Sequence, residues 1–159
     1  MAADFHIYFG KMQLNNIMTF LDRIKTNHIL AISVGVVYLW FGMLKFFAQL
    51  SPAEELAQKT IDLLTFGLVV PEVSIILLAI WETAVGTLLI LNVAHKPVIV
   101  LALIHMACTF APLFLFPDKS FSTYPFGYTL LGQYIFKNVV IIAALVTLYR
   151  EENHKLVTS

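Results

Sequence analysis

The sequence PEVSIILLAIWETAVGTLLILNV, residues 71–93, is long and apolar enough to form a helix that crosses a lipid bilayer. One acidic residue, Glu82, lies near its middle. A carboxylate at this depth is energetically costly unless it is paired, protonated or hydrated. Glu82 therefore predicts a polar site inside the part of the protein that the membrane surrounds.

The composition of the whole chain also favours a membrane environment. Of its 159 residues, 59% are hydrophobic and 13% are charged, and the mean hydropathy is +0.82. A soluble domain of this size has too little interior to bury so many apolar side chains. The formal net charge is zero, which argues against a nucleic-acid partner. The single cysteine, Cys108, allows no intramolecular disulfide or redox pair. We expect one compact integral membrane domain.

Four apolar segments divide the chain, and each matches the length of about 20 residues that a bilayer requires. They are residues 29–50, 71–93, 96–116 and 128–149. The sequence thus predicts an all-α protein, a bundle of four transmembrane helices within residues 29–149. We expect residues 1–28 to form a cytoplasmic segment with a short amphipathic helix near 16–26, and residues 150–159 to form a cytoplasmic tail.

The linker after the first segment begins with Ser51, Pro52, Ala53 and Glu54. Serine at the N-cap, proline at the first helical position and glutamate two residues later form a capping box. This pattern predicts a short amphipathic helix that ends near Gly67. Two interpretations remain open, an ordinary interfacial linker and a lid over a site.

Basic residues are unevenly distributed between the loops. The termini and the second loop carry six of them, and the other two loops carry two. The six are Lys11, Arg23, Lys25, Lys96, Arg150 and Lys155, and the two are Lys59 and Lys119. Because cytoplasmic loops are enriched in lysine and arginine, this distribution predicts that both termini are cytoplasmic.

Small and polar residues recur along the first segment at intervals of three and four. They are Ala31, Gly35, Tyr38, Gly42, Lys45 and Gln49. Such a stripe lets neighbouring transmembrane helices approach closely. We expect it to face the bundle, and the opposite apolar face to meet lipid.

The polar residues within the predicted spans define a candidate site. Counting helical rise from the span ends places Glu82 and Lys137 at matching depth, which predicts an ion pair between them. A pair of this kind can also serve only to fix helix register. Glu82 and His105 are the candidates for proton exchange. The candidate ligand contacts are Lys45, Lys137, Gln133, Asn138, Tyr38 and Trp81.

The charges in this set do not balance. Lys45 and Lys137 face one clear intramembrane acid, Glu82, unless Glu72 or Asp118 reaches inward from the outer edge. A surplus cation favours an anionic or carbonyl-bearing ligand. Lys45 is expected to lie outward of the ion pair, so we expect entry from the outer side. His105 has no second strong ligand at coordinating spacing, so no metal or heme site is expected.

Three short motifs and their order resemble the DoxX-like superfamily of four-helix bacterial membrane proteins. They are GMLKFF at residues 42–47, followed by a PAEE-containing linker, WETAVGTLLIL at 81–91 and GQYIFKNVVIIAAL at 132–145. The sequence is most similar to the reactive chlorine resistance membrane protein group, over residues 30–149. Where that group commonly has Lys-Asp, this chain has Lys137-Asn138, which removes one possible counter-ion.

The resemblance implies a multi-pass protein of the bacterial inner membrane. Some members of the superfamily are small subunits of a quinone-linked oxidoreductase, others are associated with oxidative stress, and distant relatives are assembly or trafficking factors. Our leading hypothesis is a quinone or small-anion site used in respiratory or oxidative-stress redox chemistry, with a partner redox protein or a homo-oligomer. The alternative is a non-enzymatic membrane partner or assembly factor with a structural ion pair. Solute transport is less favoured, because the sequence shows no broken helix beyond a kink at Pro112.

Overall fold

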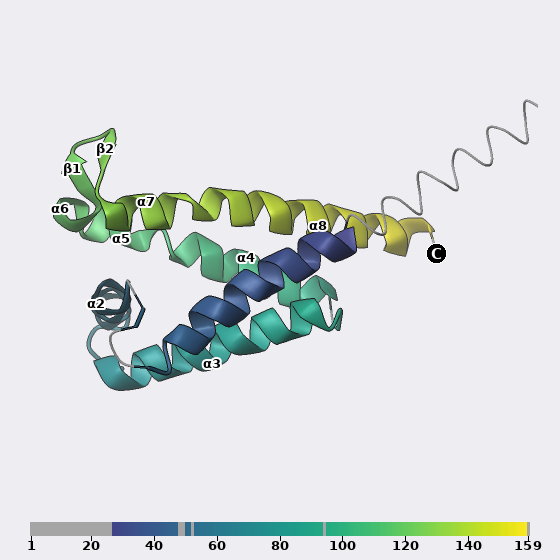
Figure 1. Ribbon diagram of the computed structural model, residues 1–159, viewed down its shortest axis with the longest axis horizontal. Coiled ribbons are helices and arrows are strands. Elements are labelled where there is room, and N and C mark those ends of the chain that lie inside the picture. The colour runs from purple at the N-terminus through teal and green to yellow at the C-terminus, as the bar shows by residue number, and fades with distance from the viewer. Residues whose placement is uncertain (1–26, 48–49, 52, 94, 159) are drawn as a thin grey trace, which may run out of the picture.

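The computed structural model describes residues 27–47, 50–51, 53–93 and 95–158. Four helical segments in these residues are long and apolar enough to cross a membrane. The first helix is Asn27–Leu44, coloured purple to blue in Figure 1, and the second is α3, Pro71–Ile90. The third joins α4, His95–Cys108, to α5, Ala111–Leu115. The fourth joins α7, Leu130–Phe136, to α8, Asn138–Thr158. The predicted all-α bundle of four helices is confirmed.

The first span is shorter than predicted. Its helix ends at Leu44, and the following residues form tight turns in which the Lys45 amide donates to the Gly42 carbonyl oxygen at 3.2 Å. The predicted continuation of this helix to residue 50 is therefore wrong. Lys45 follows the helix instead of lying within it. The expected helix near residues 16–26 lies outside the described residues.

The third and fourth spans each contain an irregularity that the sequence prediction did not include. The third is interrupted at Thr109 and Phe110. Pro112 has no amide hydrogen, so the carbonyl of Cys108 loses its usual helical partner there. The fourth changes from α7 to α8 at Lys137. The structure thus corrects the expectation that only a kink at Pro112 would disturb these helices.

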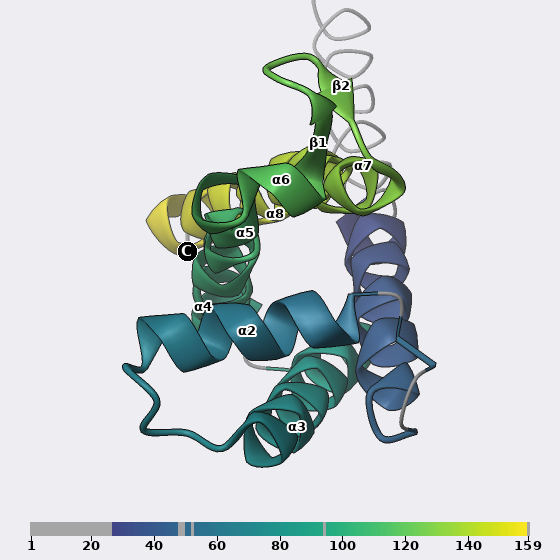
Figure 2. The ribbon, with the colours of Figure 1, turned by 90° about the vertical axis from the view of Figure 1, so that its left-hand side faces the viewer.

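The linker helix α2, Glu54–Leu64, lies across one end of the bundle and contacts α3 and α5 (Figure 2). The predicted capping box is wrong, because Ala53 is the N-cap and no side chain caps the helix. The helix ends where predicted: Phe66 and Gly67 have positive φ angles of 54° and 74°, and the Gly67 amide donates to the Asp62 carbonyl oxygen at 2.9 Å.

The helix α2 is amphipathic, as predicted. Leu56 and Thr60 are buried, whereas Glu55 and Lys59 form an exposed ion pair one turn apart at 2.5 Å. The hydrogen bond from Lys59 and its positive charge lower the pKa of the Glu55 carboxyl. The polar face of α2 thus points away from the bundle, and its apolar face covers the end of the bundle.

A small hairpin lies at the same end of the bundle as α2. Helix α6, Pro117–Ser120, leads into strand β1, Phe121–Thr123, which pairs with antiparallel strand β2, Gly127–Tyr128. The turn between α3 and α4 and the C-terminal end of α8 lie at the opposite end (Figure 1). The loops therefore divide between two ends in the way that the four-span topology predicts.

Close contact between the first helix and α3 depends on glycine. A Cβ atom added at Gly86 would lie 2.5 Å from the amide nitrogen of Leu39 and 2.7 Å from the carbonyl oxygen of Gly35. A Cβ atom at Gly42 would lie 2.7 Å from the amide nitrogen of Thr83. All described members of the predicted stripe are buried, whereas Gln49 lies outside the described residues. The small-residue interface is confirmed, and the opposite face, with Val36, Trp40 and Met43, is exposed.

Candidate functional site

A cavity of about 180 Å³ lies inside the bundle beneath α2. Its walls come from the first helix, α2, α3 and both interrupted spans, which surround the centre of the view in Figure 2. Apolar side chains form most of the wall. The charged and polar side chains that line it are Tyr38, Lys45, Thr60, Glu82, His105, Cys108, Thr109, Tyr134, Lys137 and Asn138. The cavity therefore collects residues from segments far apart in the sequence.

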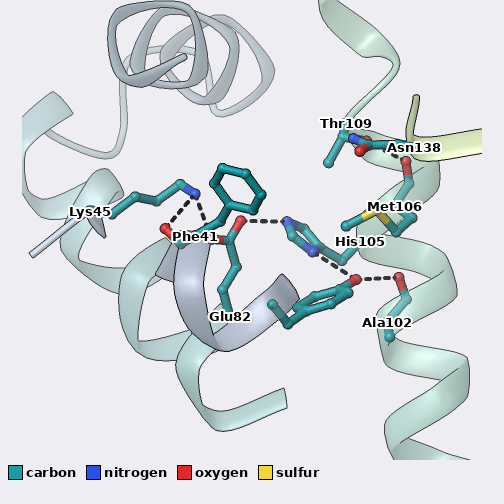
Figure 3. A network of polar contacts seen from close by, with 9 residues as sticks. Phe41, Lys45, Glu82, Ala102, His105, Met106, Thr109 and Asn138 are labelled. Atoms are coloured by element: carbon teal, nitrogen blue, oxygen red, sulfur yellow. Dashed lines mark hydrogen bonds and ion pairs between the residues drawn. The ribbon is translucent and has the colours of Figure 1, made fainter. Parts of the chain in front are cut away.

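Glu82 is paired with Lys45. The Nζ atom of Lys45 donates to Oε2 of Glu82 at 2.5 Å and to the Phe41 carbonyl oxygen at 3.2 Å (Figure 3). The side chains of Lys45 and Glu82 are 8% and 10% exposed. Removing either partner would leave an uncompensated charge in a buried position.

The predicted ion pair between Glu82 and Lys137 is wrong. Lys45 was expected to lie within a longer first helix. Because that helix ends at Leu44, the lysine after it is free to extend toward α3. Helical rise predicts depth along one helix, but the partner of a long side chain also depends on helix tilt and on the position of the helix end.

His105 and Tyr38 extend the polar network from Glu82. The Nε2 atom of His105 lies 3.7 Å from Oε1 of Glu82, and its Nδ1 atom lies 3.3 Å from the Tyr38 hydroxyl oxygen. The Tyr38 hydroxyl donates to the carbonyl oxygen of Ala102 at 3.0 Å. Figure 3 shows the carboxylate and imidazole facing each other. The structure thus brings Glu82 and His105 together, and their exchange of a proton stays a prediction.

The hydrogen bonds of Tyr38 restrict the protonation of His105. A carbonyl oxygen only accepts, so the single hydroxyl hydrogen of Tyr38 is used by Ala102. His105 must then donate from Nδ1 to the hydroxyl oxygen. Its Nε2 atom faces Glu82 and either carries a second proton or is open to one. One exchangeable proton can thus be held between the imidazole and the carboxylate.

Lys137 forms a different contact from the one predicted. Its Nζ atom lies 3.9 Å from the ring centroid of Tyr134 and 4.6 Å from that of Phe41. The two rings pack edge to face, with centroids 5.4 Å apart. Of the carboxylates in the described ranges, none pairs with Lys137, and both Glu72 and Asp118 are exposed. The expected surplus of positive charge is therefore present among the described residues.

The remaining predicted residues are placed as follows. Asn138 donates from Nδ2 to Oγ1 of Thr109 at 3.1 Å and so joins the two interrupted spans beside the cavity. Gln133 is exposed and donates to the Tyr128 carbonyl oxygen at 3.4 Å. Trp81 packs against the hydrophobic core cluster. Neither Gln133 nor Trp81 lines the cavity.

The sequence did not predict the aromatic side of the site, and the lid interpretation of the linker named no residue of α2 that lines the cavity. Tyr134 lies three residues before Lys137, a spacing that places both on one face of a helix, so the sequence contained this signal. Phe41 carried none, because its contact is formed only when the first and fourth spans pack together. The same holds for Leu56, Thr60 and Ile61 of α2, which line the cavity.

Replacement of Tyr38 with phenylalanine is expected to lower the free energy of unfolding by about 1–2 kcal/mol. The change removes the hydroxyl that accepts from His105 and donates to Ala102, and it leaves the imidazole Nδ1 without its partner. Equilibrium unfolding in detergent would measure the loss. Tyr149 to phenylalanine on α8 is the matched control, and equal losses in the two variants would contradict the role given to Tyr38.

The site thus presents a paired acid and lysine, an imidazole, a phenol and a second lysine to one small cavity. Among the described residues, no cluster of three histidine, cysteine or acidic side chains could hold a metal ion. These groups can bind an anionic or carbonyl oxygen and exchange a proton with it. No family model, curated protein or solved structure matches the chain.

Proposed function

We propose that the protein is a DoxX-like protein of the bacterial inner membrane whose cavity binds a quinone or a small anion in respiratory or oxidative-stress redox chemistry. The observation that carries the proposal is the meeting of Glu82, His105 and two lysines around one cavity. Ionisable groups within membrane spans are costly and usually mark ligand or proton paths. The order of the three family-like motifs along the chain gives independent support.

The residues divide into two roles. Lys137 or Lys45 binds a carbonyl or anionic oxygen of the ligand by a charge-assisted hydrogen bond. Glu82 and His105 pass protons one at a time, since the imidazole Nε2 and the carboxylate face each other and can hold one proton between them. Reduction of a quinone to a quinol also requires two electrons, which a partner redox protein supplies in this proposal. The chain then acts as the membrane subunit that positions the quinone.

The proposed topology places both termini in the cytoplasm. It is supported by the excess of basic residues in the termini and the second loop. The α3–α4 turn and the C-terminal end of α8 lie at one end of the bundle, opposite α2 and the hairpin (Figure 1). The cavity lies beneath α2, so ligand entry from the outer side or the outer leaflet follows.

The proposal is tested by the quinone content of the purified protein. Protein extracted gently from bacterial membranes is expected to carry quinone. The Lys137→Met variant is expected to carry at least about 10-fold less, the effect of losing one charge-assisted contact. The Glu82→Gln variant is also expected to carry less, because it removes the carboxylate that orients Lys45. Chromatography and mass spectrometry of organic extracts would measure it. Lys59→Met is the matched control, because Lys59 is exposed on α2.

The same measurements can also contradict the proposal. Absence of quinone from the wild-type protein, together with anion binding that is unchanged in Glu82→Gln and Lys137→Met, would overturn the proposed function. The network would then be structural, as in a membrane partner or assembly factor, and a larger protein should co-purify with the chain.

A further inference from the structure

Only one of the two lysines in the cavity is neutralised. Lys45 is held by Glu82 at 2.5 Å, and its remaining contact is the Phe41 carbonyl oxygen. Lys137 is itself exposed, and among the described residues its charged group contacts only the faces of Tyr134 and Phe41. Aromatic rings stabilise a cation but do not cancel its charge. With Glu82 ionised and His105 neutral, the described residues that line the cavity therefore carry one excess positive charge, on Lys137.

The volume and the apolar wall of the cavity limit the size and polarity of an anionic ligand that could balance this charge. Its volume of about 180 Å³ is close to that of an engineered cavity of roughly 150 Å³ in another protein that binds benzene. Leu56, Ile61 and Leu64 of α2 line it, as do Pro112 and Ile141 on the interrupted spans. An apolar wall of this extent favours an apolar ligand body over a fully hydrated inorganic ion.

We infer that the occupant of this cavity is a monovalent organic anion with an apolar body about the size of one six-membered ring, and that Lys137 binds its charged group. This inference rests on the proposed function, since it names the ligand class of the same site. The anionic group contacts Nζ of Lys137, which keeps its two aromatic contacts. The ring lies against the apolar wall, and Lys45 stays bound to Glu82.

The two lysines thus have different roles, the reverse of the roles that the sequence predicted, in which Lys137 paired with Glu82 and Lys45 lay outward of the pair. Lys137 makes the site prefer an anionic ligand over a neutral one, because its charge has no acidic partner among the described residues. Lys45 instead contacts Glu82 and fixes the orientation of its carboxylate. A neutral molecule of the same shape fills the cavity but leaves the excess charge of Lys137 unbalanced, so it should bind more weakly.

The test compares two probes of nearly equal shape, 4-fluorobenzoate and its neutral amide, by fluorine NMR on the purified full-length protein in detergent. Wild-type protein is expected to bind the anion at least about 10-fold more tightly than the amide. Lys137→Met should abolish the difference, and Lys137→Arg should largely restore it. Lys59→Met should leave it unchanged, since Lys59 lies on the exposed face of α2. Circular dichroism spectra confirm that each variant is folded.

Different results would overturn this inference and the proposed function. Equal binding of the two probes by wild-type protein, or a preference that survives in Lys137→Met, would overturn the inference. A short-chain neutral quinone is the third probe. If it binds and the anion does not, the inference is wrong and the quinone proposal stands. If none of the three binds, both are wrong.

Discussion

The Glu82→Gln variant is expected to lose about 3 kcal/mol of unfolding free energy, the cost of leaving one member of a buried ion pair alone. Lys45 would then keep only its contact with the Phe41 carbonyl oxygen. Lys45→Met is expected to cost a similar amount, because it leaves the carboxylate unpaired. The double variant should cost much less than the sum of the two, since it removes both charges together.

A second double-mutant cycle, between Glu82→Gln and Lys137→Met, gives the control. Lys137 contacts aromatic rings and no carboxylate of the described residues, so these two changes should be nearly additive, within about 0.5 kcal/mol. Unfolding equilibria in detergent, followed by circular dichroism, would measure both cycles. A large coupling with Lys137 and none with Lys45 would show that the ion pair has been assigned to the wrong lysine.

Gly86→Ala is expected to destabilise the protein by about 2–3 kcal/mol, although it adds a single methyl group. The new Cβ atom would lie 2.5 Å from the amide nitrogen of Leu39 and 2.7 Å from the carbonyl oxygen of Gly35. Both neighbours are backbone atoms, so the first helix must move away from α3. That movement would also separate Lys45 from Glu82, because the two residues come from these two segments.

The matched control for Gly86→Ala is Ala84→Val on the same helix. Ala84 is exposed on α3, so its larger side chain meets no other helix. Thermal unfolding in detergent should show a marked decrease in melting temperature for Gly86→Ala and little change for Ala84→Val. Similar behaviour of the two variants would mean that the first helix and α3 are not in the close contact described here.

The fold was largely predictable because length and hydropathy determine which segments can cross a bilayer. The small-residue stripe from Ala31 to Lys45 also identified the buried face of the first helix, since glycine and alanine at helical spacing permit close approach. Helix ends were less predictable. Ser51 had the right neighbours for a cap, yet α2 begins at Glu54, with Ala53 as its N-cap, and Ser51 is buried before the helix.

The composition of the site was more predictable than its pairing. Lys45, Glu82, His105 and Lys137 could be chosen because ionisable residues in apolar spans are rare and costly. Which lysine meets Glu82 depends on where the first helix ends, and hydropathy locates such an end only to within a few residues. The contact of Lys137 with Phe41 depends on packing between the first and fourth spans, which no local pattern of residues reveals.

A density map of the protein in lipid nanodiscs, at a resolution that shows side chains, tests most directly whether this cavity is a ligand site. We predict density for a ring-sized molecule beneath α2, in contact with Nζ of Lys137, while Lys45 remains bound to Glu82. The ligand site would be contradicted if the side chains closed the cavity, or if a lipid tail filled it, and Glu82 turned toward Lys137.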